Sequence, residues 1–200
     1  MAGLVRLRAR AGWPDQRRLS GGRGGRLRIA VSARPRIGVS ACLLGEAVRY
    51  DGGHKAAPGL IAALRAFAEL VPLCPEAGAG LGVPRPPVAL HWTDGEVRMR
   101  GVEDPGWDPT AAVQNWIAAQ AGVLGGLHGA VLKARSPSCG IGTTPLHLPD
   151  GGERLASGLL AAHLSERWPR LPLADEETLA DDAALAVFRD RVLAYRREAP

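Results

Sequence analysis

Three cysteines, Cys42, Cys74 and Cys139, are the only thiols in this 200-residue sequence. Each of them follows a short apolar segment, at residues 36–40, 70–73 and 129–133. Segments of this kind are typical of buried β-strands. If the three strands lie parallel in one sheet, their carboxyl ends meet at one edge, where ligands of open α/β sheets bind. Three thiolates at that edge predict a metal or iron–sulfur site.

The number of cysteines narrows the kind of site without settling it. A structural zinc site usually has four protein ligands, often from C-x-x-C pairs, and the sequence contains no such pair. None of the histidines stands at a ligand spacing from a cysteine; they are His54, His91, His128, His147 and His163. A [4Fe–4S] cluster usually takes four thiolates, so three would leave one iron open to a substrate. We favour such a cluster, with zinc or three simply buried thiols as the alternatives.

A carboxyl group accompanies the second cysteine, in the tripeptide Cys74-Pro75-Glu76. A glutamate two residues beyond a ligand can share the same pocket and act as a general acid or base. The alternative is a solvated glutamate in a loop or at a helix start. Beside a ligand, we favour the catalytic interpretation of Glu76.

Polar residues also surround the third cysteine, in the segment 136–142. Ser136 and Ser138 lie in a turn shaped by Pro and Gly, and the hydroxyl and N–H groups of such a turn can bind an anion or a carbonyl oxygen. Lys133 could hold a negative ligand, or could be a strand-end lysine that reaches solvent. Further candidates to line the same pocket are Ser40, Tyr50 and Asp51.

The elements needed to position these residues alternate between strands and helices. Besides the three strands above, the pattern predicts helices at 58–68, 108–121, 153–167 and 175–197, a β-hairpin at 88–92 and 96–100, and a last strand at 171–173. Residues 78–87 are too rich in Gly and Pro for regular structure. Strand–helix alternation predicts an α/β fold. We expect a three-layer, Rossmann-like sandwich with a mostly parallel sheet and a small β-hairpin insertion.

Charge divides the chain into two parts. Residues 1–36 contain ten Arg and one acidic residue. The rest of the chain has a net charge of −4, and the net charge of the whole chain is +5. A segment rich in Arg, Gly and Ser cannot bury enough apolar surface to fold alone. We therefore expect residues 1–35 to form a disordered basic tail and residues 36–200 to form the folded domain.

Composition also bears on partners and location. An odd number of cysteines without the spacing of a disulfide framework indicates a reducing compartment, and we expect the protein to be cytoplasmic. No apolar segment approaches the roughly 18 residues of a membrane helix. Nucleic-acid binding is expected only through the Arg-rich tail, if at all. No feature indicates an oligomeric state.

Several segments together resemble the DUF523 family, which includes the thiouracil desulfurases. The resemblance rests on residues 37–45, 48–55, 74–76, 82–87 and 132–140, and extends over about 36–198. It implies a [4Fe–4S] cluster bound by three cysteines, which match Cys42, Cys74 and Cys139. It also implies non-redox removal of sulfur from a thiolated pyrimidine such as 2-thiouracil, with release of sulfide.

The resemblance further implies roles for two side chains. Glu76 matches the acid/base glutamate of the family, and Ser136 matches a serine near the substrate. A soft metal site suits a sulfur-containing ligand. A Lewis acid can draw off sulfide without electron transfer. The alternatives are a non-catalytic iron–sulfur or zinc protein that carries or senses sulfide, and a nucleic-acid-associated protein that acts through its tail.

Overall fold

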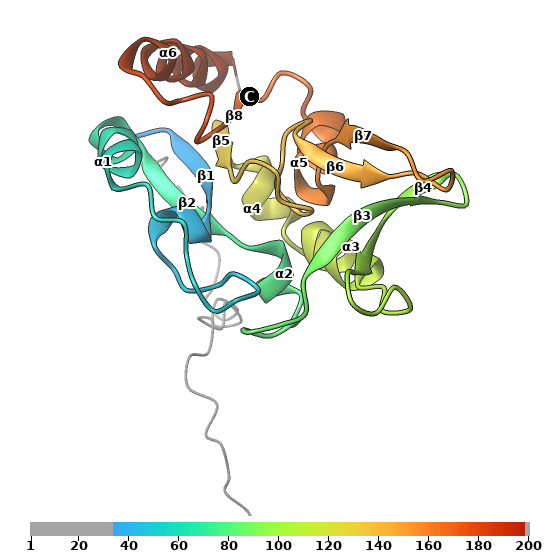
Figure 1. Ribbon diagram of the computed structural model, residues 1–200. Coiled ribbons are helices and arrows are strands. Elements are labelled where there is room, and N and C mark those ends of the chain that lie inside the picture. The colour runs from blue at the N-terminus through green and yellow to red at the C-terminus, as the bar shows by residue number, and fades with distance from the viewer. Residues whose placement is uncertain (1–33, 199–200) are drawn as a thin grey trace, which may run out of the picture. The chain divides into compact units, whose positions relative to one another are not determined.

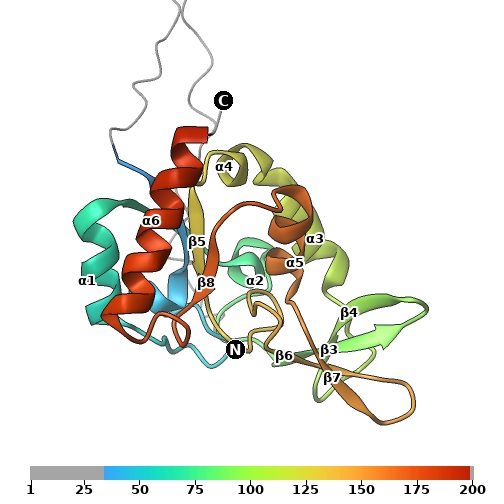
Figure 2. The same cartoon turned by 90° about the horizontal axis from the view of Figure 1, so that it is seen from above.

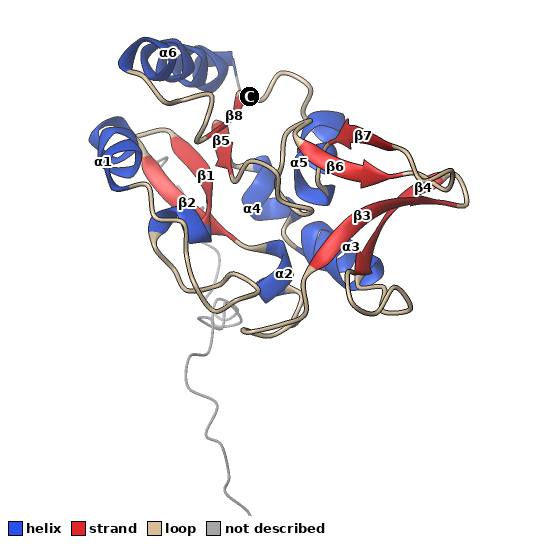
Figure 3. Cartoon of the chain, in the orientation of Figure 1, coloured by secondary structure: helices blue, strands red, loops and turns tan. Residues whose placement is uncertain are grey.

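The computed structural model describes residues 34–198, so the predicted tail lies almost entirely outside the described residues. Figure 3 shows how strands and helices are distributed along the chain. In chain order the elements are β1 (Arg36–Ser40), the 3₁₀ turn η1 (Ala41–Leu44), α1 (Pro58–Phe67), β2 (Glu69–Leu73), α2 (Pro75–Gly78), β3 (Val88–Thr93), β4 (Glu96–Gly101), α3 (Thr110–Ala119), α4 (Ala121–Gly125), β5 (Gly129–Leu132), β6 (Thr144–His147), β7 (Glu153–Ala156), α5 (Leu159–Arg167), β8 (Leu173–Asp175) and α6 (Asp182–Glu198).

The first sheet is entirely parallel and has the strand order β2-β1-β5-β8. Ser40 at the end of β1 is opposite Leu73 at the end of β2. Because these two strands end at the same level, the chain segments that follow them start side by side. The predicted parallel sheet, with its carboxyl ends at one edge, is therefore confirmed.

Helices cover both faces of this sheet (Figure 1, Figure 2). On one face α1 and α6 pack against β1 and β5, through a core that includes Ile37, Leu64, Val131, Phe188 and Val192. On the other face lie α3, α4 and α5, whose buried side chains pack with Leu73 and Leu132 of the sheet. The predicted three-layer α/β sandwich is thus confirmed.

A second sheet, of strand order β4-β3-β6-β7, packs on the far side of α3 and α5. It contains the predicted hairpin: β3 and β4 pair antiparallel around the Asp94-Gly95 turn. Strand β6 then adds parallel to β3, and β7 adds antiparallel to β6. The hairpin is therefore half of a four-stranded sheet rather than a small isolated insertion.

The structure corrects several predicted boundaries. The predicted helix at 153–167 is wrong at its start, because residues 153–156 form β7 and pair with β6. Helix formers such as Glu153 and Leu155 favour a helix locally, but strand pairing overrides that preference. Strand β6 itself occupies a segment for which no regular element was predicted.

Three further boundaries differ near other turns. The last strand runs over 173–175 instead of 171–173. The Asp175 carboxylate accepts the N–H groups of Glu177 and Thr178, and this turn delays α6 from residue 175 to 182. The predicted helix at 108–121 is divided into α3 and α4.

In the described part of the chain, no helix combines the length and apolarity needed to span a membrane.

Candidate metal centre and active site

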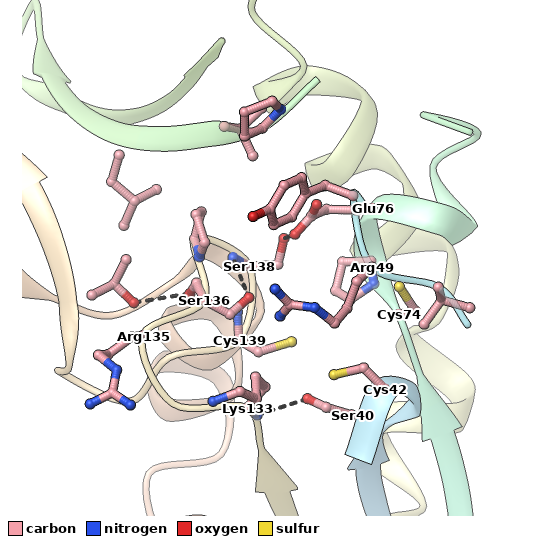
Figure 4. A pocket seen from close by; sticks show the side chains of 18 of the residues that line it. Ser40, Cys42, Arg49, Cys74, Glu76, Lys133, Arg135, Ser136, Ser138 and Cys139 are labelled. Carbon is pink, nitrogen blue, oxygen red and sulfur yellow. Dashed lines mark hydrogen bonds between the residues drawn. The ribbon is translucent and has the colours of Figure 1, made fainter. Parts of the chain in front are cut away.

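A pocket of about 380 Å³ lies at the carboxyl ends of β1, β2 and β5. The first sheet contributes all three cysteines to its lining, and the second sheet faces them with Ala89, Leu90, Pro145 and His147. Figure 4 shows the cysteine side chains directed into one space together with Glu76 and Ser138. Cavities of this size and mixed polarity are typical of small-molecule sites.

The cysteines reach this pocket from three separate segments. Cys42 lies in the 3₁₀ turn after β1, and Cys74 directly follows β2 at the start of α2. Cys139 lies in the loop between β5 and β6, and its side chain is buried. All three are free thiols. Residues far apart in the sequence are thus brought together, as predicted from the parallel sheet.

Burial controls the charge state of these thiols. It raises the pKa of Cys42 to about 11, and the nearby Cys74 adds to the rise. Burial also raises the pKa of Cys74. For Cys139 burial again raises the pKa, while a hydrogen bond with Ser40 acts against it and the other two cysteines add to the rise. The thiols therefore interact with one another, and a bound cation would be needed to make them all thiolates at neutral pH.

This donor set fits an iron–sulfur cluster better than a single ion. Within residues 34–198, no three His, Cys, Asp or Glu side chains are arranged to hold one metal ion. A [4Fe–4S] cluster takes one thiolate at each iron, so its ligands stand around a larger body. Three soft sulfur donors in one pocket suit that body, and they would leave one iron without a cysteine.

The turn that carries Cys139 is held by the start of α5. The N–H groups of Gly158, Leu159 and Leu160 donate to the carbonyl oxygens of residues 140, 137 and 138, respectively. A Cβ atom at Gly158 would lie only 2.5 Å from the Ser138 carbonyl carbon. Only glycine therefore permits this close approach of two backbones, and the approach fixes the position of Cys139.

Glu76 is held at both carboxylate oxygens. Its Oε1 accepts a hydrogen bond of 2.7 Å from the Ser138 hydroxyl. Its Oε2 accepts from Nε of Arg85 at 2.9 Å and pairs with the second terminal nitrogen of Arg85 at 2.8 Å. The side chain is 12 % exposed, and that of Arg85 is 4 % exposed. Glu76 is thus oriented in the pocket, beside an arginine that the sequence pattern did not indicate.

Arg85 also joins two loops around the pocket. Its remaining terminal nitrogen donates to the carbonyl oxygens of Val48 and Gly82, at 3.0 and 2.9 Å. Its backbone N–H donates to the carbonyl oxygen of Tyr50. The signal for this role lay in the sequence Pro84-Arg85-Pro86-Pro87, which was interpreted only as a constrained loop. A buried arginine in such a loop needs fixed acceptors.

The two serines of the Cys139 turn have different contacts. Ser136 Oγ accepts the backbone N–H groups of Ser138 and Cys139, at 3.3 and 3.2 Å. It thereby shapes the turn, although it also lines the pocket. The Ser138 hydroxyl instead points to Glu76 (Figure 4). The hydroxyl in direct contact with the carboxylate is that of Ser138.

Ser40 and Lys133 support the start of the segment that leads from β5 to the Cys139 turn. Ser40 is almost fully buried, and its Oγ accepts the Lys133 backbone N–H at 2.9 Å. The Lys133 ammonium group pairs with Glu176 and donates to the Ala134 carbonyl oxygen at 3.1 Å. Both residues line the pocket, but their polar groups are already engaged by the protein.

The predicted residues Tyr50 and Asp51 are placed differently. Tyr50 lines the pocket and is 42 % exposed, at its rim. Asp51 lies outside the lining: it accepts the Gly53 N–H at 2.9 Å, and this bond lowers the pKa of its carboxyl group. It pairs with Nε of Arg49 at 3.5 Å. Arg49 does line the pocket, although its place in the sequence did not indicate this.

Comparison with known proteins gives two matches. The family model described as 2-thiouracil desulfurase matches residues 37–176. A solved structure of the [4Fe-4S]-dependent thiouracil desulfidase TudS (DUF523Vcz) is similar, with 32 % sequence identity and a TM-score of 0.60. The match covers 77 % of this chain and 98 % of that one. No curated protein sequence matches the chain.

Proposed function

Because this chain belongs to the 2-thiouracil desulfurase family, we propose that it removes sulfur from a thiolated pyrimidine such as 2-thiouracil and releases it as sulfide. The reaction depends on a [4Fe–4S] cluster and involves no redox step. The observation that carries the proposal is the convergence of three thiols and Glu76 on one pocket.

Cys42, Cys74 and Cys139 hold the cluster. When bound, the cluster supplies a Lewis-acidic iron that has no cysteine ligand and has an affinity for sulfur. Residues of β3 and β6 face the cysteines across the pocket, and Cys139 is buried while Cys42 and Cys74 are partly buried, which limits the access of water to this position. No side chain needs to supply an electron.

The net reaction consumes one water. A C=S bond of the pyrimidine breaks, a C=O bond forms, and the sulfur leaves as hydrogen sulfide, so atoms and electrons balance without an oxidant. Glu76 takes a proton from the attacking water and returns it to the leaving sulfur. Ser138 and Arg85 each bind one oxygen of its carboxylate and so fix the direction in which it acts.

The remaining candidate residues have supporting roles. Ser136 shapes the Cys139 turn and borders the substrate space. Ser40 and Lys133 hold the base of that turn, and Tyr50 forms part of the rim. Asp51 acts through Arg49.

The protein works in the cytoplasm in this proposal, because free thiols and an iron–sulfur cluster with an open iron persist best under reducing conditions. Residues 1–35 are a separate basic tail that desulfuration does not require. RNA binding that is lost on deletion of residues 1–34 would give the tail a nucleic-acid role. RNA binding that survives the deletion would assign it to the folded domain.

The experiment is anaerobic reconstitution with iron and sulfide, followed by incubation with 2-thiouracil. We expect sulfide and uracil to be released in equal amounts, with no added reductant. A cluster that assembles but releases sulfide from no thiolated base would overturn the proposal, and would favour a sulfide carrier or sensor. Protein reconstituted with zinc alone is the control, and should release none.

A further inference from the structure

Three arginines line the pocket, and they differ in how their guanidinium groups are used. Arg85 is committed to Glu76 and to two carbonyl oxygens. Arg135 directs both terminal nitrogens to the Glu177 carboxylate. Arg49 has one ion pair, from the inner nitrogen Nε to Asp51. No described side chain or carbonyl oxygen accepts a hydrogen bond from the two terminal nitrogens of Arg49.

The position of Arg49 directs those terminal nitrogens toward the cysteines. Figure 4 shows its guanidinium group extending into the same space as the side chains of Cys42 and Cys139, whereas Arg135 points away from it. Arg49 and the three cysteines line the same pocket, so its guanidinium group and the sulfur atoms face one space. An arginine with free donors beside the sulfur site can therefore contact a molecule bound there.

The guanidinium group is also held in place before any ligand arrives. Asp51 pairs with it at 3.5 Å, and Asp51 is itself fixed by the Gly53 N–H. The guanidinium carbon lies 5.3 Å from the centre of the Tyr50 ring, in a cation–π contact. The side chain is 22 % exposed. A donor fixed from two sides loses little conformational freedom on binding, which favours a specific contact.

We propose that Arg49 is a specificity-determining residue that donates hydrogen bonds to the oxo oxygen of the substrate ring while the thiocarbonyl sulfur faces the cysteines. This inference rests on the proposed function and deepens it, because it selects pyrimidines that carry an oxo group beside the thiocarbonyl group. A planar fork of donors suits such an oxygen better than a point charge does. An arginine that only balanced the charge of the cluster would not distinguish ring substituents.

The test compares two substrates in two variants. The substrates are 2-thiouracil and pyrimidine-2-thione, which has the thiocarbonyl group but no oxo group. In Arg49→Met we expect kcat/KM for 2-thiouracil to fall roughly 10- to 100-fold, as for loss of a charged hydrogen bond, and kcat/KM for pyrimidine-2-thione to stay near the wild-type value. Arg135→Met is the matched control, and should preserve the wild-type ratio between the two substrates.

Binding gives a second readout that needs no turnover. Calorimetry of the reconstituted protein with uracil, the product, should show a similar 10- to 100-fold loss of affinity in Arg49→Met, with unchanged iron content. Equal losses for both substrates, or unchanged uracil affinity, would overturn the role of Arg49. If the wild type releases no sulfide, the proposed function fails, and uracil binding alone decides the role of Arg49. Absence of uracil binding by the wild type would overturn that role too.

Discussion

The two sheets meet at one pocket but contribute different chemistry to it. The first sheet ends in three cysteines, with Glu76, Ser138 and Lys133 in the segments that follow its strands. The second sheet contributes mainly apolar side chains and one titratable group, His147, which pairs with Glu153 at 2.9 Å. The first sheet positions reactive groups, and the second gives the pocket a mainly apolar wall. Substitutions in the two sheets should therefore separate activity from stability.

The largest expected effect is at the thiols. Replacing Cys42, Cys74 or Cys139 by Ser removes a soft ligand, so each variant should lose most of its iron on anaerobic gel filtration and all measurable sulfide release. Iron content and turnover are measured on the same samples. A serine variant that retained its iron and its rate would exclude that cysteine as a ligand.

The next largest loss of rate is expected at the Glu76 carboxylate. Glu76→Gln keeps the shape of the side chain but removes the proton acceptor, so kcat should fall roughly 10²- to 10⁴-fold while iron content stays that of the wild type. Cluster absorbance and steady-state rate are compared in parallel. A wild-type rate in this variant would remove Glu76 from the reaction.

A smaller loss of rate is expected at Arg85, which contacts Glu76 and is almost fully buried. Arg85→Met should lower kcat roughly 10- to 100-fold, with less effect on KM, because Glu76 is no longer oriented. It should also destabilise the fold, since it leaves one member of a buried pair alone.

A double variant separates these two consequences at Arg85. Adding Glu76→Gln to Arg85→Met should recover stability toward urea without recovering the rate. If the double variant were slower than Glu76→Gln by the full factor seen in Arg85→Met, Arg85 would not act through Glu76.

The second sheet should show the opposite pattern. Met99 is fully buried in β4 and does not line the pocket. Met99→Ala should lower the free energy of unfolding by about 2–5 kcal/mol, measured by urea denaturation. It should leave kcat unchanged well below the unfolding temperature. A loss of rate without a loss of stability would mean that the second sheet takes part in the chemistry.

The contrast between the sheets also explains what the sequence could predict. Strands β1 and β5 of the first sheet are buried on both faces, so Ile37, Val39 and Val131 produce the continuous apolar runs that identify parallel strands. Each cysteine lies in the segment that follows one of the strands β1, β2 and β5. Their convergence therefore followed from topology, and the family resemblance is confirmed by the matching family model and the similar structure.

The second sheet was harder to predict because its strands depend on partners distant in sequence. Leu146 of β6 lies between Leu90 of β3 and Arg154 of β7. Nothing within residues 144–147 or 153–156 reveals either pairing. Local preference therefore gave no strand for β6 and favoured a helix for β7, and the structure shows a strand at both places.

The side-chain contacts inside the site could also not be predicted from the sequence. Arg85 finds Glu76 only because the loop over 78–87 folds back on α2. Whether Ser136 or Ser138 contacts Glu76 depends on which hydroxyl points out of the turn, and sequence spacing alone does not decide that. Glu76 itself was predictable because it adjoins a ligand.

The most direct test of the central claim is the metal content of wild-type protein purified and reconstituted without oxygen. We expect about four iron atoms and four sulfides per chain, with a Mössbauer spectrum in which one iron differs from the other three because it lacks a cysteine. One zinc per chain, or four equivalent irons, would contradict it.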